Sequence, residues 1–184
     1  MKIENLNKSF GEKTIFKDFN CEFKDGCVNY LMGESGIGKT TLMRLISGLD
    51  KDYSGNIEKP NKISYVFQEP RLFSTLTVIE NIKLVEQGTK KSAEKILKML
   101  ELTSAKGLYP SELSGGMKMR LSLARALYYN GDLFLMDEPF SSLDIDMKER
   151  IIPKIMREIK GKTVIIISHD KNEAEKYADN IIIL

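Results

Sequence analysis

"VNYLMGESGIGKTTLMRLIS", residues 28–47, decides how the rest of this chain is interpreted. Its first five residues form a short apolar run, which predicts a buried strand, and the pattern Gly-x-x-x-x-Gly-Lys-Thr follows directly at residues 33–40. A helical pattern then extends from Thr40 to Leu49. A strand, a glycine-rich loop and a helix in this order favour a phosphate-binding P-loop over a purely structural turn.

The P-loop motif predicts a nucleotide site with a bound cation. Its glycines let backbone N–H groups point toward an anion without a Cβ clash, and the helix N-terminus adds the positive end of its dipole. We expect Lys39 to reach the β- and γ-phosphates and the Thr40 hydroxyl to ligate Mg²⁺. The residues expected around the nucleotide phosphates are Gly33, Glu34, Ser35, Gly36, Ile37, Gly38, Lys39, Thr40 and Thr41.

A second part of the same site is predicted at "LFLMDEP", residues 133–139. A buried strand ending in Asp137 delivers a carboxylate to Mg²⁺, which is the role of the strand aspartate in P-loop NTPases. Glu138 follows at the strand tip, where it can polarise an attacking water molecule. An acidic pair after a strand also serves as a helix cap, and that alternative stays open until the P-loop is considered.

Composition limits the class of protein. The chain has 184 residues, of which 42% are hydrophobic and 29% charged, as expected for one soluble globular domain with its own core. Its net charge of +2 argues against nucleic acid or an anionic membrane as the main partner. No apolar run is long enough to span a bilayer, and the N-terminus "MKIENLNKSF" lacks a signal-peptide core. The two cysteines, Cys21 and Cys27, have no metal-ligand spacing and are expected to be reduced.

The order of apolar segments predicts an α/β fold with a P-loop NTPase core and a mostly parallel sheet. Further strands are expected at 63–67, 163–167 and 181–184, and alternating segments at 2–7 and 19–23 predict an antiparallel N-terminal β flank. About 65 residues with helical signals separate two of these strands, so we expect an inserted helical subdomain at about 70–130 within a single domain, 1–184. Two apolar stripes mark its helices: Ala93, Ile96, Leu97 and Leu100, and Met117, Leu121, Ala124 and Tyr128.

Nucleotide binding alone does not choose the reaction. A GTPase needs a guanine-reading Asn-Lys-x-Asp motif, and "NKSF" and "NKIS" both lack the aspartate. A small-molecule kinase needs a second substrate pocket and a mobile arginine lid, and neither is evident in the sequence. The remaining glycine-rich stretch, "SELSGGMKMRLSLARAL" at 111–127, predicts a helix start with a serine N-cap, and such a helix end also binds anions.

Taken together, the motifs resemble the nucleotide-binding domain of an ATP-binding cassette (ABC) protein over nearly the whole chain. The resemblance rests on the P-loop at 33–40, "VFQEP" with Gln68, "LSGGM" at 113–117, the strand 133–137 with Glu138, "SSLD" ending at Asp144, and "ISHD" with His169. Six ordered motifs are far more specific than any one of them. By the same resemblance, Phe10 in "NKSFG" is the aromatic that stacks on adenine, with a core phenylalanine as the alternative.

The resemblance also implies a role for each matching residue. Lys39 neutralises phosphate charge, Glu138 is the candidate general base, and His169 holds the γ-phosphate and the attacking water. Gln68 senses the γ-phosphate and takes part in the metal site with Thr40 and Asp137. Two cassettes pair head to tail, so that Ser114, Gly115 and Gly116 of one chain contact the ATP held by its partner, and Asp144 communicates with the partner's site.

The expected function is therefore an ATPase, the ATP-hydrolysing subunit of an ABC transporter, on the cytoplasmic face of the cell membrane. "QEPRLFSTLTVIENI", residues 68–82, resembles the region of bacterial importer ATPases that receives a coupling helix from a separate permease. The resemblance favours the nitrate, sulfonate and taurine importer group. It therefore implies that the transported solute is a small anionic or organic molecule and that a solute-binding protein takes part. No accessory regulatory domain is expected. Expected partners are ATP, Mg²⁺, a second copy or a paralogous cassette, and the permease, without nucleic acid. The alternatives are a soluble ABC ATPase of DNA repair, chromosome structure or translation, and a cassette that binds ATP but turns over poorly.

Overall fold

A computed structural model describes residues 1–85 and 92–184, and the chain divides into two compact units. The first unit consists of Met1–Ile63, Asp132–Asp137 and Gly161–Leu184, and the second of Ser64–Gly131 and Glu138–Lys160. Part of the predicted insertion, residues 86–91, lies outside the described residues. The assignment of 1–184 to one ABC ATPase domain stays a prediction.

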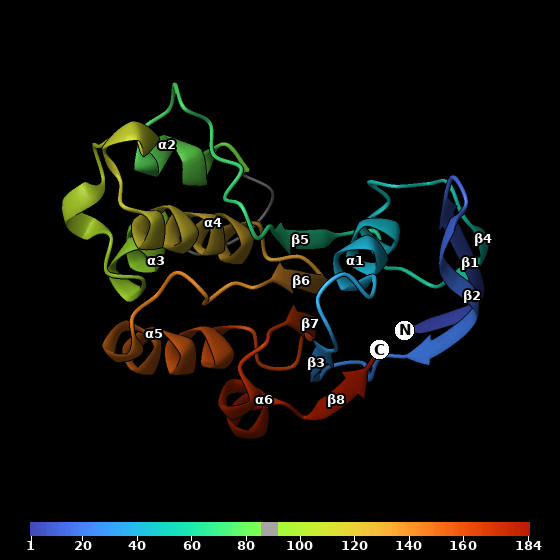
Figure 1. Ribbon diagram of the computed structural model, residues 1–184. Coiled ribbons are helices and arrows are strands. Elements are labelled where there is room, and N and C mark those ends of the chain that lie inside the picture. Colours follow the sequence, from blue (N-terminus) through green and yellow to red (C-terminus); the bar gives the residue numbers. More distant parts are fainter. Residues whose placement is uncertain (86–91) are drawn as a thin grey trace. The chain divides into compact units, whose positions relative to one another are not determined.

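Parallel strands form the core of the first unit (Figure 1). β6 (Leu133–Asp137), β7 (Thr163–Ile167), β3 (Val28–Met32) and β8 (Asn180–Ile183) are neighbours in that order, and each pair is parallel. The full strand order, with β5 (Ile63–Val66), is β5-β6-β7-β3-β8. Every residue of β6 is buried, as expected for a parallel strand covered on both faces. The predicted α/β fold class is confirmed.

An antiparallel sheet of order β2-β1-β4 also belongs to the first unit. It contains β1 (Lys2–Phe10), β2 (Lys13–Glu22) and β4 (Ser54–Ile57), so the predicted antiparallel flank is confirmed. The two predicted segments were too short, because the hairpin continues to a tight turn at Gly11–Glu12. β4 was not predicted, because three of its four residues are exposed and it has no apolar pattern.

Two helices complete the first unit. α1 (Lys39–Ser47) packs against β6 and buries four apolar side chains: Leu42, Met43, Leu45 and Ile46. It ends two residues before the predicted end, because Gly48 takes a left-handed conformation and donates its N–H to the last turn of the helix. α6 (Lys171–Tyr177) connects β7 to β8 and is capped by Asp170.

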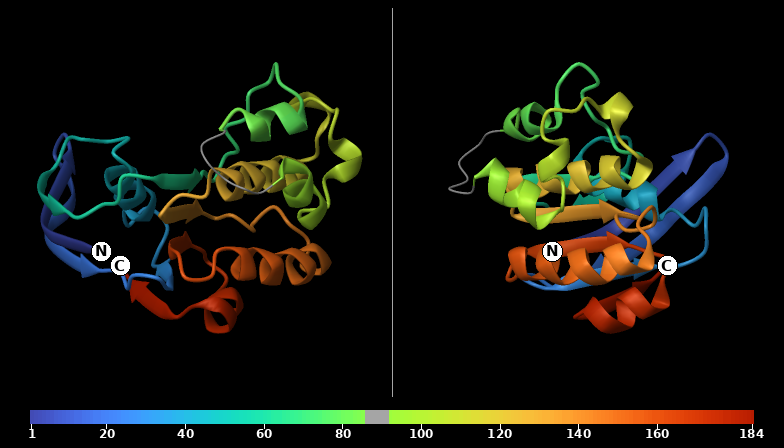
Figure 2. Two further views of the ribbon diagram at one scale, coloured as in Figure 1. Left: turned by 180° about the vertical axis from the view of Figure 1, so that it is seen from behind. Right: turned by 90° about the vertical axis from the view of Figure 1, so that its left-hand side faces the viewer.

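Helices dominate the second unit. In chain order they are α2 (Val78–Lys83), α3 (Ala93–Met99), the 3₁₀ turns η1 (Thr103–Ala105) and η2 (Pro110–Glu112), α4 (Gly115–Tyr129) and α5 (Ile145–Glu158). α2 and α3 lie beside α4 (Figure 2). The stripe predicted on α3 is buried, and so are Leu121, Ala124 and Tyr128 on α4, whereas Met117 is half-buried. No helix within residues 1–85 and 92–184 has the length and apolar character needed to cross a membrane.

Candidate nucleotide site

The predicted P-loop lies between β3 and α1 in the first unit. Its last glycine, Gly38, has φ +118°, and a Cβ there would lie 2.8 Å from a methyl carbon of Ile15 and 2.9 Å from the ring of Phe16. Both the backbone conformation and the space therefore require glycine at this position. Gly33 and Gly36 also have positive φ angles. The loop thus runs close against β2 before α1 begins.

Lys39 is folded back over the loop. Its Nζ lies 2.8 Å from the carbonyl oxygens of both Gly33 and Glu34 and donates a hydrogen bond to each. Although it is a lysine, the residue is only 6% exposed. A buried ammonium held at the mouth of a glycine loop, beside a helix N-terminus, is an arrangement that binds polyphosphate.

Thr40 and Asp137 meet at the base of this loop. The Thr40 hydroxyl donates a hydrogen bond of 2.8 Å to Asp137 Oδ2. Burial raises the pKa of the Asp137 carboxyl, while the Thr40 hydrogen bond and the charges of Arg44 and Lys39 act in the opposite direction. A hydroxyl and a carboxylate oxygen are hard ligands of the kind that Mg²⁺ takes, so Thr40 and Asp137 are residues that would hold this ion. Within the described residues, no cluster of three or more His, Cys, Asp or Glu side chains is placed to hold a metal, at this loop or elsewhere.

His169 is exposed just beyond β7, in a turn that buried polar groups hold in place. The Ser168 hydroxyl donates to Glu173 Oε2 at 3.1 Å and accepts from the backbone N–H of Asp170 at 3.1 Å. Asp170 in turn accepts from the first N–H groups of α6. Neither Ser168 nor Glu173 belongs to a motif that predicts this supporting role.

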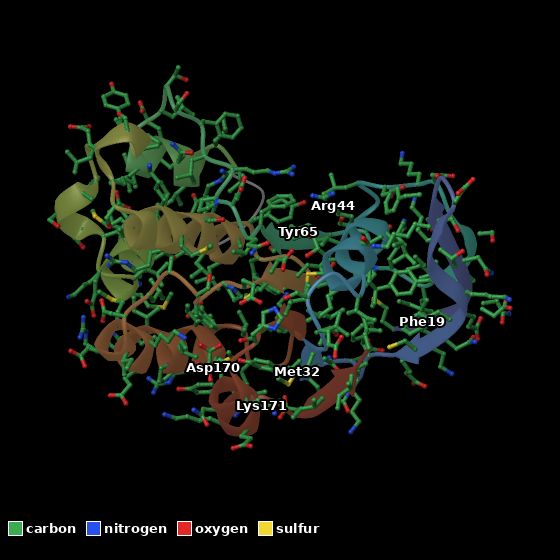
Figure 3. The ribbon with its side chains drawn as sticks, viewed as in Figure 1. Phe19, Met32, Arg44, Tyr65, Asp170 and Lys171 are labelled. Carbon is green, nitrogen blue, oxygen red and sulfur yellow. The ribbon has the colours of Figure 1, made fainter. Side chains whose placement is uncertain are left out.

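His169 and the start of the P-loop line one pocket of about 470 Å³, so the structure brings these two predicted parts together. Met32, at the end of β3, and Lys171, at the start of α6, belong to the same lining (Figure 3). The complete lining is Met32, Gly33, Glu34, Ser168, His169, Lys171, Ala174, Glu175, Ile181 and Ile183.

Phe10 ends β1 and is 52% exposed, which excludes the alternative of a core phenylalanine. The Lys8 ammonium lies 4.5 Å from the centroid of its ring. Lys8 itself is buried, and no role was predicted for it from the sequence. The available signal was its position two residues before Phe10, because residues i and i+2 of a strand point to the same face.

The second unit carries the predicted "LSGGM" motif at 113–117, called the signature below. Ser114 is the N-cap of α4 and accepts a hydrogen bond from the Met117 N–H at 3.3 Å. A Cβ on Gly116 would lie 3.1 Å from the Ser142 carbonyl oxygen, so the signature is packed against the "SSLD" segment. Asp144 accepts from the Met147 N–H at 2.8 Å and caps α5, a local role that the sequence analysis did not assign to it.

Two further predicted residues also lie in the second unit. Glu138 directly follows the buried Asp137, is half-buried and has φ +51°, which is uncommon for a residue with a side chain. Its carbonyl accepts from the N–H and the hydroxyl of Ser141. Gln68 is exposed, two residues beyond β5. Because Gln68 belongs to the second unit and Thr40 to the first, its place in the metal site stays a prediction.

Comparison with protein families decides between a GTPase, a small-molecule kinase and an ABC ATPase. The ABC transporter family matches residues 16–141, more than half of the chain. The chain belongs to the ABC transporter family. It is accordingly an ATPase of the ABC type, and the predicted family is confirmed.

Individual relatives of this ABC cassette are import proteins. The chain is 36% identical to the aliphatic sulfonates import ATP-binding protein SsuB 1 of Paracoccus denitrificans (strain Pd 1222), over 99% of this chain and 78% of that protein. It is also 36% identical to the sulfate/thiosulfate import ATP-binding protein CysA of Synechocystis sp. (strain ATCC 27184 / PCC 6803 / Kazusa), over 99% of this chain. The chain spans only 57% of the length of that CysA protein.

Solved structures of ABC cassettes share the fold. The dimeric structure of MJ0796, a bacterial ABC transporter cassette, matches with a TM-score of 0.86 and 31% identity, over all of this chain and 93% of the other. A dimeric post-hydrolysis state of the same cassette, bound to ADP and Pi, matches with a TM-score of 0.85 and the same identity and coverage.

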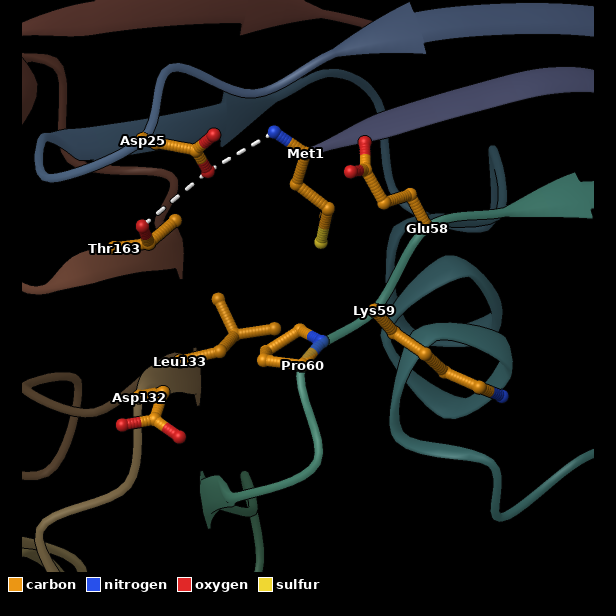
Figure 4. Close-up of a pocket in the computed structure, with 8 residues that line it drawn as sticks. All are labelled: Met1, Asp25, Glu58, Lys59, Pro60, Asp132, Leu133 and Thr163. Atoms are coloured by element: carbon orange, nitrogen blue, oxygen red, sulfur yellow. Dashed lines mark hydrogen bonds and ion pairs between the residues drawn. The ribbon is translucent and has the colours of Figure 1, made fainter.

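A second pocket, of about 280 Å³, lies at the amino ends of the strands of this ABC cassette, whereas the P-loop follows the carboxyl end of β3 (Figure 4). Its lining includes Leu133 and Thr163, the first residues of β6 and β7, whereas Asp137 ends β6. Asp25 Oδ1 lies there, 3.0 Å from the Met1 amine and 3.5 Å from the Thr163 hydroxyl. Ligands of open α/β sheets bind at the carboxyl ends of the strands, so this pocket is not the nucleotide site.

The contact between Gly116 and the "SSLD" segment leads to a testable difference between two adjacent glycines. Gly115 has open space where a Cβ would stand, whereas a Cβ on Gly116 would press on the Ser142 carbonyl. Gly115→Ala should stabilise the cassette by up to about 1 kcal/mol, because alanine favours the helix. Gly116→Ala should be about 1–3 kcal/mol less stable than Gly115→Ala, because the segment must move.

Urea unfolding of the two variants beside the unsubstituted chain measures this difference. Gly115→Ala is the matched control, since both variants add the same methyl group to the same turn of α4. Equal free energies of unfolding for the two variants would contradict the packing of Gly116 against Ser142.

Proposed function

We propose that this chain is the ATP-hydrolysing subunit of an ABC importer for a small anionic solute, working through a separate membrane permease. The observation that carries the ATPase is the 2.8 Å hydrogen bond between Thr40 and Asp137, which joins the P-loop to the acidic strand. The import function is supported by relatives named for the import of aliphatic sulfonates and of sulfate or thiosulfate.

In this proposal, the first unit binds the nucleotide. The P-loop N–H groups and Lys39 bind the phosphates, and the exposed ring of Phe10 stacks on adenine. Thr40 and Asp137 hold Mg²⁺, with Gln68 as a further oxygen ligand. When bound, Mg²⁺ supplies positive charge that neutralises the phosphate oxygens. His169 orients the γ-phosphate from the pocket that it shares with Gly33 and Glu34.

The remaining predicted residues act in hydrolysis and in pairing. Glu138 accepts a proton from the attacking water, at the tip of the strand that ends in Asp137. Two cassettes pair head to tail, and Ser114, Gly115 and Gly116 donate hydrogen bonds to the γ-phosphate of the ATP held by the partner. Such pairing is supported by the dimeric structures of a related cassette. The partner is a second copy of this chain or a paralogous cassette, and Asp144 lies in the segment next to Gly116.

We place the permease contact at the segment that follows Gln68. Phe73 is 47% exposed there, and the Arg125 guanidinium lies 5.2 Å from its ring centroid. The fully buried Asn81 holds this segment, accepting from the Phe73 N–H at 2.9 Å and donating to the Phe73 carbonyl at 3.0 Å. A rigidly held loop that presents an aromatic ring suits a helix from the permease, on the cytoplasmic face of the membrane.

Uptake in the source organism tests this proposal. Deletion of the gene should remove the uptake of radiolabelled aliphatic sulfonate or sulfate. A solute-binding protein is the expected further component of the transport system. The unsubstituted gene should restore uptake, and Lys39→Ala, produced at the same level, should not. Unchanged uptake of both anions, together with copurification on ribosomes or DNA, would instead support the soluble ABC ATPase.

A further inference from the structure

We propose that Lys8 is a positioning residue for the adenine base, which fixes the ring of Phe10 from one side while Asp50 and Asp52 hold the lysine in place. This inference rests on the proposed function, because it takes Phe10 as the residue that stacks on adenine. It adds to that function a buried cation and two acidic residues to which none of the motifs assigns a role.

The Lys8 ammonium is held at four points. Its Nζ lies 3.0 Å from Asp50 Oδ2, 3.2 Å from Asp52 Oδ2 and 2.6 Å from the Asp52 carbonyl oxygen. The fourth contact is with Phe10, whose ring centroid is 4.5 Å away. Because the residue is only 3% exposed, this ammonium has exchanged most of its water for these partners.

The charge of Lys8 is maintained at neutral pH. Burial lowers the pKa of the Lys8 ammonium, but the hydrogen bonds and charges of Asp50 and Asp52 outweigh burial, so that the pKa is raised. The pKa of Asp50 is lowered, chiefly by its hydrogen bond with Lys8. The group facing the ring is therefore a full cation.

A cation fixed over one face of an aromatic ring attracts it and limits its rotation. Phe10 is 52% exposed, so without such a partner its ring would have to be ordered when the base binds. With Lys8 on one face, the opposite face is the one left for a planar base. Lys8 thus lowers the entropy cost of stacking and sets which face of the ring is used.

The same contacts tie the two ends of the nucleotide site together. Asp50 and Asp52 lie between α1 and β4, and the Asp50 N–H donates to the Arg44 carbonyl in the last turn of α1. Since α1 begins at the P-loop, the helix that receives the phosphates is connected through Lys8 to the strand that carries Phe10. The distance between phosphate and base positions is therefore fixed within the first unit.

The test compares the binding of ATP, which carries an adenine base, with that of inorganic tripolyphosphate, which carries none. We expect Lys8→Met to raise the Kd for ATP by about 3–10-fold and to leave the Kd for inorganic tripolyphosphate within about twofold, because only ATP needs the ring. Lys8→Gln is the second variant, since it keeps N–H donors for Asp50 and Asp52 and removes only the charge. Lys17→Met, at an exposed position on β2, is the matched control and should bind both ligands normally.

A substitution of Phe10 separates the possible failures. Phe10→Leu should weaken ATP binding but not tripolyphosphate binding, and in that background Lys8→Gln should have no further effect on the Kd for ATP. If Phe10→Leu leaves ATP affinity unchanged, the adenine assignment fails and this inference fails with it. If Phe10→Leu weakens ATP binding but Lys8→Gln does not, the inference is overturned and the adenine assignment stands. The same conclusion follows if Lys8→Gln weakens the binding of ATP and of tripolyphosphate alike.

Discussion

Glu138→Gln should lower ATP turnover by at least about 100-fold and leave the Kd for ATP within about twofold, because a general base typically contributes 10²–10⁴-fold. Glutamine fills the same space and keeps a hydrogen-bonding end, but it cannot accept the proton from water. The residue follows Asp137 directly and has a left-handed backbone conformation, with Ser141 hydrogen-bonded to its carbonyl. Such a sparsely populated conformation persists where the surrounding structure fixes it, often at functional sites.

The same substitution should change the oligomeric state. If hydrolysis is what opens a head-to-tail pair of ABC cassettes, a chain that binds ATP without hydrolysing it should accumulate as a dimer. Phosphate release measures turnover, and light scattering after size exclusion with ATP and Mg²⁺ measures mass. Glu149→Gln, an exposed carboxylate on α5, is the matched control and should hydrolyse ATP normally. Undiminished turnover by a monomeric Glu138→Gln chain would remove Glu138 as the base.

Three strands of the parallel sheet, β3, β6 and β7, could be predicted because most of their residues are buried on both faces. β3, β6 and β7 begin and end at the predicted residues, and each is a continuous apolar run or nearly so. β8 is shifted by one residue, to Asn180–Ile183, because the polar Asn180 pairs with Asn29 of β3 in the backbone register and also donates a side-chain hydrogen bond of 3.0 Å to Asn29 Oδ1. β4 has neither apolar alternation nor burial, and its strand conformation comes from pairing with β1.

The local motifs of the site could be predicted, whereas the groups that support them could not. A P-loop is a continuous pattern, so Lys39 and Thr40 follow from their neighbours in the chain. Lys8 is 42 residues from Asp50, and Gly116 contacts Ser142 from a different segment. These contacts depend on how distant segments pack, which no local pattern encodes. Asp144 is an intermediate case, since an aspartate before a helical segment is a common N-cap signal.

Ser114→Arg should abolish ATP-dependent pairing and lower turnover by at least about 100-fold, while ATP binding to the single chain stays within about twofold. Removing one donor to the transition-state charge costs about 10²–10³-fold, and the arginine side chain also fills the space of the partner's phosphate. Ser114 also caps α4, so Ser114→Ala is needed to measure the loss of the cap alone, expected at about 1 kcal/mol of stability. Ser111→Arg, an exposed serine in η2, is the matched control for the added charge and bulk.

Mixing variants tests whether the site is shared between chains. Ser114→Arg has an intact P-loop and a blocked signature. Lys39→Ala has a defective P-loop and an intact signature. Each variant alone should be inactive, but a mixed head-to-tail pair contains one site with both intact halves, so turnover should reappear on mixing. Such recovery is impossible if each site lies within one chain, because neither chain then holds a complete one. A mixture that stays inactive while forming ATP-dependent dimers would therefore contradict the shared site, and with it the reason for a second phosphate-binding motif in this chain.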